Sequence, residues 1–130
     1  KTLIQKEAGG RKKVIFYNTT VSAILQSGEA MLDKIERVLC MFREESGEVV
    51  LLWRPHPLME ATLASMRPHL LERYRRIVEE YKAAGWGIYD DSADLDRAIA
   101  VSDGYYGDMS SVVWLYRETG KPVMIQIAEY

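Results

Sequence analysis

The sequence predicts an α/β fold of three layers, with helices on both faces of a doubly wound, mostly parallel sheet. Three observations predict it. Short runs of apolar and β-branched residues recur along the chain, amphipathic helical stretches separate them, and glycines or prolines mark the boundaries. Strands that alternate with helices form right-handed crossovers, which place the strands parallel, so the expected architecture is Rossmann-like.

The chain has 130 residues, which is long enough for one domain with a core of its own. Residues 1–12 are polar and include Gly9 and Gly10, so we expect a linker or the tail of a preceding element there. The domain is expected to span residues 13–130. Because the first residue is Lys1 rather than Met, we expect the chain to be a fragment of a longer protein.

The first half of the predicted domain begins with a buried strand over residues 14–17, followed by a polar loop at 18–20. Apolar residues at helical spacing predict a helix over 29–44. Residues 49–53 form a continuous apolar run, typical of a strand covered on both faces. A short helix over 58–66 follows, and then a helix that Pro68 opens and Gly85 ends.

The second half repeats the alternation of strand and helix. A weaker third strand is predicted at 87–91, and Ser92 or Asp94 caps a helix that contains Leu95, Ala98 and Ile99. Tyr105 and Tyr106 form a short strand, residues 108–111 a turn, and a helix continues to Thr119, closed by Gly120. Residues 123–127 are predicted to be the last strand.

In such a sheet, all the loops that follow the strands lie at one edge, where ligands bind near the point at which the strand order reverses. The loops expected there comprise residues 18–20, 54–57, 90–92 and 107–111. Asn18 and Thr19 belong to the first of them. These four loops define the candidate site.

The loop Arg54-Pro55-His56-Pro57 supplies two candidate residues. Its prolines predict a stiff segment that continues neither a helix nor a strand ladder. An arginine there can bind phosphate through two hydrogen bonds, and a histidine between two prolines is held in place before a ligand arrives. We therefore predict that Arg54 and His56 bind substrate, whereas a solvated arginine and an exposed histidine are the structural alternatives.

Ser110 and Ser111 stand just before an apolar helical run. Hydroxyl groups in that position cap free backbone N–H groups, and the same region attracts phosphate. Capping and ligand binding are compatible, so we predict that both serines, together with Asp108, contribute to a substrate site. For Asp108, an N-terminal cap is the alternative.

Several function classes are not indicated. A net charge of −2 gives no basic footprint for nucleic acid, and no apolar run approaches the length of a membrane span. The single cysteine, Cys40, lies opposite the apolar stripe of its helix, so we expect a surface thiol. Because Walker loops, Rossmann glycine triplets and zinc-ligand spacings are all missing, we expect neither a metal nor a cofactor.

Taken together, four motifs resemble the C-terminal half of the CDP-glycerol glycerophosphotransferases, the teichoic-acid polymerases and primases of GT-B architecture. In that family an R-x-H-P loop is followed by an A-D pair, a T-D-Y-S-S turn and a K-P before the last strand. The corresponding segments here are Arg54 to Pro57, Ser102-Asp103, Gly107 to Ser111, and Lys121-Pro122. The likeness covers residues 13–127.

The resemblance implies half of a GT-B fold and a metal-independent transfer of glycerol phosphate from CDP-glycerol, or a related CDP-activated donor, to a cell-wall polymer. It places His56 as the catalytic residue near the donor phosphates, with Ser110 and Ser111 beside it. The general base is expected in an N-terminal GT-B domain, the partner of this one, so the fragment alone is expected to be inactive. The parent enzyme is expected to be cytoplasmic, with possible peripheral contact to the membrane.

Other functions remain open at this point. One is a non-catalytic module of the same fold that binds a nucleotide or phosphate. Another is a glycosyltransferase that uses a nucleotide sugar. A third, a purely structural interaction domain, leaves unexplained why an arginine, a histidine and paired serines fall on one edge of the sheet.

Overall fold

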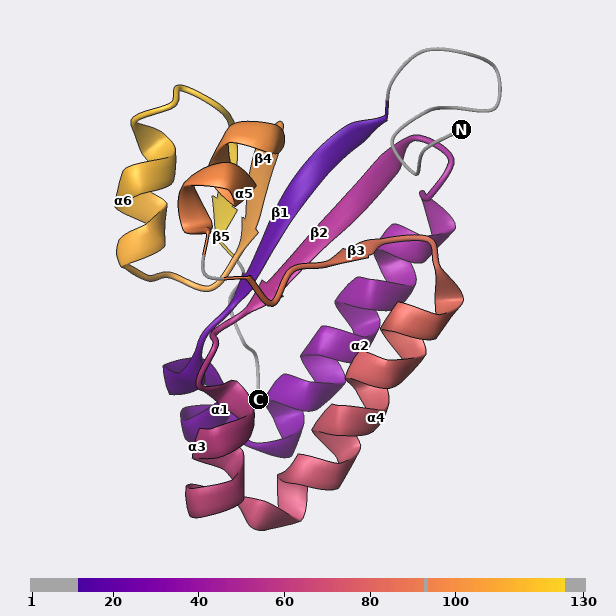
Figure 1. Ribbon diagram of the computed structural model, residues 1–130, viewed down its shortest axis with the longest axis vertical. Helices are drawn as coiled ribbons and strands as arrows, with labels where there is room; N and C mark the ends of the chain where they lie inside the picture. Colours follow the sequence, from indigo (N-terminus) through magenta and orange to yellow (C-terminus); the bar gives the residue numbers. More distant parts are fainter. Residues whose placement is uncertain (1–11, 93, 126–130) are drawn as a thin grey trace.

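Five parallel strands form one sheet with the order β3-β2-β1-β4-β5 (Figure 1). The computed structural model describes residues 12–92 and 94–125. Its strands are β1 Lys13–Thr19, β2 Val49–Pro55, β3 Ile88–Tyr89, β4 Gly104–Gly107 and β5 Val123–Ile125. Its helices are α1 Val21–Ser27, α2 Glu29–Glu44, α3 Met59–Met66, α4 Pro68–Ala84, α5 Leu95–Val101 and α6 Ser111–Arg117. The predicted three-layer, Rossmann-like α/β fold is confirmed.

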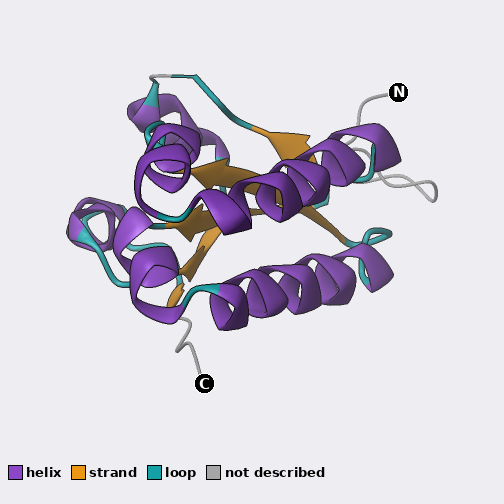
Figure 2. Cartoon of the chain, turned by 90° about the horizontal axis from the view of Figure 1, so that it is seen from below, coloured by secondary structure: helices purple, strands orange, loops and turns teal. Residues whose placement is uncertain are grey.

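Helices cover both faces of the sheet (Figure 2). One core, between the sheet and helices α1 to α4, contains Tyr17 and Trp53. The other core, beneath α5 and α6, contains Phe16 and Leu52. Neighbouring residues of each central strand thus enter opposite cores, as the twofold period of a strand requires, and this explains why β1 and β2 are apolar almost throughout.

Most of the predicted boundaries are confirmed. Pro68 stands in the first turn of α4, Gly85 ends that helix in the left-handed conformation, and the carboxylate of Asp94 caps α5 by accepting from the Arg97 N–H at 3.0 Å. Cys40 is exposed, as predicted. The third strand is shorter than expected, β5 is described only to Ile125, and α6 ends at Arg117, before the Thr119 of the prediction. Residues 1–11 of the predicted linker and 126–127 of the predicted last strand lie outside the described residues.

Two boundaries at the carboxyl edge were predicted wrongly. Asn18 and Thr19 belong to β1 rather than to a loop, because pairing with β2 continues through both. A helix, α1, follows immediately, capped by the Thr20 hydroxyl, which accepts from the Ala23 N–H at 3.2 Å. Ile24 is the only residue of α1 that is buried, so the helix has little need of an amphipathic pattern and the sequence does not reveal it.

Arg54 and Pro55 were expected to lie in a loop outside the ladder, yet both belong to β2, where they pair with Asn18 and Thr19 of β1. The Trp53 carbonyl accepts from the Asp90 N–H on the β3 side, whereas the His56 N–H donates to the Thr19 carbonyl on the β1 side. The missing N–H of Pro55 therefore faces the β3 side, beyond the point at which β3 ends. No ladder bond is lost there, so a proline is tolerated.

At Gly107 the backbone of β4 lies directly against Asn18 of β1. A Cβ atom at this position would collide with the backbone oxygen of Asn18, and the φ angle of 155° is one that other residues rarely adopt. We expect Gly107→Ala to lower the free energy of unfolding by about 1–3 kcal/mol, measured by urea denaturation.

Gly47→Ala is the matched control, because a Cβ there meets no atom within 4 Å. It should leave the free energy of unfolding nearly unchanged. Equal stability of the two variants would show that the close approach at Gly107 is not a real constraint.

Candidate functional site

A cavity of about 260 Å³ lies at the carboxyl edge of the sheet, beside the point where the strand order reverses between β1 and β4. Four segments, at or after the ends of β1, β2, β3 and β4, contribute to it. We call it the switch-point cavity. Its lining residues are Asn18, Thr20, Arg54, Pro55, His56, Pro57, Leu95, Ser110, Ser111 and Val112. Ligands of open α/β sheets bind at such a position.

The structure brings together five of the seven residues predicted for the site. They are Asn18, Arg54, His56, Ser110 and Ser111. Thr19 and Asp108 are not among the lining residues. Thr20, which belongs to one of the four predicted site loops but was not itself predicted as a site residue, is one of them.

Thr19 serves the core rather than the cavity. It is fully buried, and its hydroxyl accepts a hydrogen bond from the indole N–H of Trp53 at 3.2 Å. Side chains alternate along a strand, so Thr19 and its neighbour Asn18 point to opposite faces of β1. Only Asn18 reaches the side on which the cavity opens.

Asp108 is 5% exposed and holds the connection between β1 and α1. Its carboxylate accepts from the Thr20 N–H at 2.8 Å and lies 3.2 Å from the Thr20 hydroxyl. The carboxylate therefore positions Thr20, which itself lines the cavity. The helix cap considered for Asp108 belongs to other residues, because Ser110 caps α6 and Thr20 caps α1, and Asp108 instead holds Thr20.

A buried hydrogen-bond network fixes Ser110. The side-chain amide of Asn18 donates to the Tyr105 hydroxyl at 3.0 Å and to the Ser110 hydroxyl at 3.1 Å. Tyr105 in turn donates to the Asp108 carbonyl at 2.6 Å. Ser110 also caps α6, since its hydroxyl accepts from the Val112 N–H at 3.3 Å. Ser110 is thus held from two sides.

Tyr105 is a component of the site that sequence reasoning missed. Burial raises the pKa of its phenol to about 12, even though hydrogen bonds from Asn18 and Ser110 lower it. The phenol therefore stays protonated at neutral pH and keeps its donor role. No local sequence signal marks this residue, because its partners lie on β1 and on the turn before α6.

The guanidinium of Arg54 is oriented by the segment after β3. Its Nη1 lies 3.3 Å from the Asp90 carboxylate and donates to the Ser92 carbonyl at 2.6 Å. The side chain is only 9% exposed. Its Nε and Nη2 groups make no hydrogen bond to any residue that the structure describes, so donors remain for a ligand in the cavity.

His56 is exposed at the rim of the cavity. Its Nδ1 accepts a hydrogen bond from the Leu58 N–H at 3.1 Å, so the neutral ring carries its proton on Nε2. The backbone N–H of His56 donates to the Thr19 carbonyl at 3.1 Å, which ties the segment to β1. Two hydrogen bonds, in addition to the flanking prolines, therefore hold this imidazole in place.

The described lining of the switch-point cavity includes no carboxylate. It offers a guanidinium, an imidazole and three hydroxyl groups. Asp90 and Asp108 lie outside the lining but each engage one lining residue, Arg54 and Thr20 respectively. The remaining donors of Arg54, His56 and the two serines are suited to an anion such as a phosphate or diphosphate.

Comparisons with protein-family models, with curated proteins and with solved structures found no match. The functional inference therefore depends on the residues and geometry of the site. None of the described helices is long and apolar enough to cross a membrane.

Asp90 gives the site a measurable pH dependence. Burial raises the pKa of its carboxyl, but hydrogen bonds from Ser92 and the charge of Arg54 outweigh burial, and the pKa lies below its ordinary 3.8. A depressed pKa stabilises the fold above pH 3.8, and that contribution is lost as the pH falls through the lower, folded-state pKa.

We expect Asp90→Asn to lower the free energy of unfolding by about 1 kcal/mol at pH 7. The difference from the wild type should shrink as the pH falls below 3.8, because the unfolded wild-type chain is protonated there first, and it should vanish once the pH is below the folded-state pKa of Asp90. Urea denaturation at pH 7 and at pH 3 measures both values. A difference that stays constant with pH would contradict the role assigned to the Arg54–Asp90 pair.

Proposed function

We propose that this domain binds the diphosphate of a CDP-activated donor, as the donor-binding half of a transferase similar to the CDP-glycerol glycerophosphotransferases. One observation carries the proposal. A single cavity at the reversal point of a parallel sheet joins Arg54, His56 and the two serines, and no carboxylate is present in its described lining. The order of the sequence motifs supports the same assignment.

In this proposal each lining group has a physical role. The free N–H groups of Arg54 and the Nε2–H of His56 donate to phosphate oxygens, and the Ser111 hydroxyl adds a neutral donor. As the bond to CMP breaks, negative charge builds on the leaving phosphate, and in this proposal the His56 imidazole stabilises that charge. Asn18 acts as a positioning residue, since both of its amide hydrogens are used to hold Tyr105 and Ser110.

The proposed parent enzyme also needs a base for the acceptor hydroxyl. The described lining supplies no carboxylate for that purpose. We therefore assign the base to a second, N-terminal domain, with which this domain would form the active site. On this basis the chain alone binds the donor without turning it over.

A second candidate is nucleotide or phosphate binding without catalysis. Met109 and Leu115 favour it, because they stand where the resembled family has a tyrosine and often an acidic residue. Both side chains are about half exposed and neither lines the cavity. Activity of the parent protein with CDP-glycerol distinguishes this candidate from the enzyme.

We expect His56→Ala to weaken CDP binding about tenfold, because one donor to phosphate is lost. Ser111→Ala should weaken it by a smaller factor, since a neutral hydroxyl is lost. Ser111 is exposed, whereas Ser110 caps α6, so Ser111 is the cleaner test of the two serines. Isothermal titration calorimetry with CDP, CMP and UDP measures these effects.

His69→Ala is the matched control, because His69 is exposed at the start of α4 and does not line the switch-point cavity. It should bind CDP as the wild type does. If His56→Ala and His69→Ala bind CDP with equal affinity, His56 is not part of the site.

A further inference from the structure

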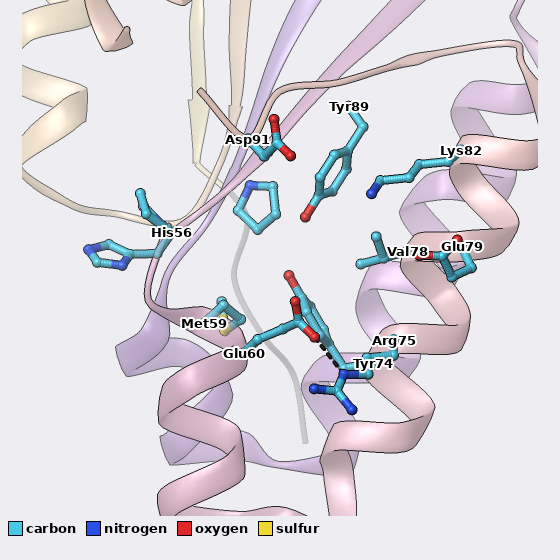
Figure 3. A pocket seen from close by; sticks show the side chains of 12 residues that line it. His56, Met59, Glu60, Tyr74, Arg75, Val78, Glu79, Lys82, Tyr89 and Asp91 are labelled. Atoms are coloured by element: carbon cyan, nitrogen blue, oxygen red, sulfur yellow. Dashed lines mark hydrogen bonds and ion pairs between the residues drawn. The ribbon is translucent and has the colours of Figure 1, made fainter. Parts of the chain in front are cut away.

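A second cavity, of about 190 Å³, adjoins the switch-point cavity and shares its wall of Pro55, His56 and Pro57. It lies between the ends of β2 and β3 and helices α3 and α4 (Figure 3). We call it the tyrosine cavity, after Tyr74 and Tyr89, which line it. The imidazole of His56 points away from these tyrosines (Figure 3).

The two tyrosines form an aromatic wall with polar tips. Their phenol oxygens point toward one another (Figure 3). Burial raises the pKa of both phenols, so both are neutral at physiological pH. The Nζ of Lys82 lies 4.6 Å from the centre of the Tyr89 ring, which holds that ring from the α4 side.

The charge of this cavity differs from that of its neighbour. Arg75 pairs with Glu60 at 2.6 Å, so these two charges offset each other. Glu79 and Asp91 also line the cavity, and neither forms a salt bridge with any residue that the structure describes. Free carboxylates repel phosphate, but they are good acceptors for ligand O–H and N–H groups.

Size links the two cavities. Small-molecule sites usually enclose about 300–1,000 Å³. Each cavity alone falls short of that range, and the two together lie within it. A ligand with a phosphate end and a polar ring end would occupy both by crossing the exposed rim at His56 and Pro57.

We propose that the tyrosine cavity binds the nucleoside end of the donor, whose diphosphate occupies the switch-point cavity. This inference rests on the function proposed above. The partly exposed ring of Tyr89 offers an aromatic wall to the ribose or base, whereas Tyr74 is buried and contributes only to the cavity lining. The carboxylates of Glu79 and Asp91 accept hydrogen bonds from ribose hydroxyls or an exocyclic amine, and this recognition separates a nucleotide from free pyrophosphate.

The test compares CDP with inorganic pyrophosphate by calorimetry on the full 130-residue chain. Glu79→Gln and Tyr89→Phe should raise the Kd for CDP about fivefold to tenfold, because each removes or weakens a hydrogen bond to the nucleoside. Neither should raise the Kd for pyrophosphate. His56→Ala should weaken the binding of both ligands.

Glu80→Gln is the matched control. Glu80 is the next residue of α4, is likewise exposed to solvent, and lines neither cavity. It makes the same charge change as Glu79→Gln and should leave both Kd values unchanged. Because Glu79 is also exposed, its substitution tests the proposal without disturbing the core, and thermal unfolding confirms that each variant is folded.

The outcomes separate the two proposals. If CDP binding depends on His56 but Glu79→Gln and Tyr89→Phe bind CDP as tightly as the wild type, the nucleoside lies elsewhere and only this inference is overturned. Tighter CDP binding by Glu79→Gln would also overturn this inference, because it would show that the Glu79 carboxylate repels CDP rather than accepting a hydrogen bond from its nucleoside. If the wild type binds neither CDP nor pyrophosphate, the proposed function fails as well.

Discussion

The close approach of β1 and β4 at Asn18 and Gly107 is the constraint on which the site depends. The Asn18 carbonyl accepts from the Asp108 N–H at 3.0 Å, and its side-chain amide reaches Tyr105 and Ser110. Only a glycine opposite Asn18 leaves room for this arrangement. One residue of the central strand therefore fixes the turn that carries the serines.

From that point the sheet topology determines the rest. Because β1 is flanked by β2 on one side and β4 on the other, the segments that follow these strands diverge and leave a cavity between them. Arg54 and His56 enter from β2, and Ser110 and Ser111 from the turn after β4. His56, between its two prolines, separates the switch-point cavity from the tyrosine cavity. The described lining of the first has no carboxylate, whereas carboxylates line the second. In the proposed function, that division separates phosphate recognition from nucleoside recognition.

Elements with strong local signals were predicted well. The apolar run before Arg54, the amphipathic period of α2 and α4, and the glycine after α4 each reflect a physical preference that acts within a few residues. The misassigned positions depend on neighbours in space. Pro55 remains in a strand because β3 has already ended beside it, and α1 forms although it buries only one residue completely, since Thr20 caps it and α2 packs near it.

By itself the sequence determined the alternation of strands and helices, the parallel sheet, and the edge at which Arg54, His56, Ser110 and Ser111 gather, because these follow from periodicity and the handedness of crossovers. Only the tertiary structure decided which polar residues face the cavity. Thr19 accepts a hydrogen bond from Trp53, Asp108 accepts one from Thr20, and Arg54 donates one to Asp90. Each buried polar group binds the partner that the packed strands place nearest. The second cavity, formed by α4 and the end of β3, was likewise beyond reach of local pattern, because its tyrosines are 15 positions apart in the chain and meet only in the fold.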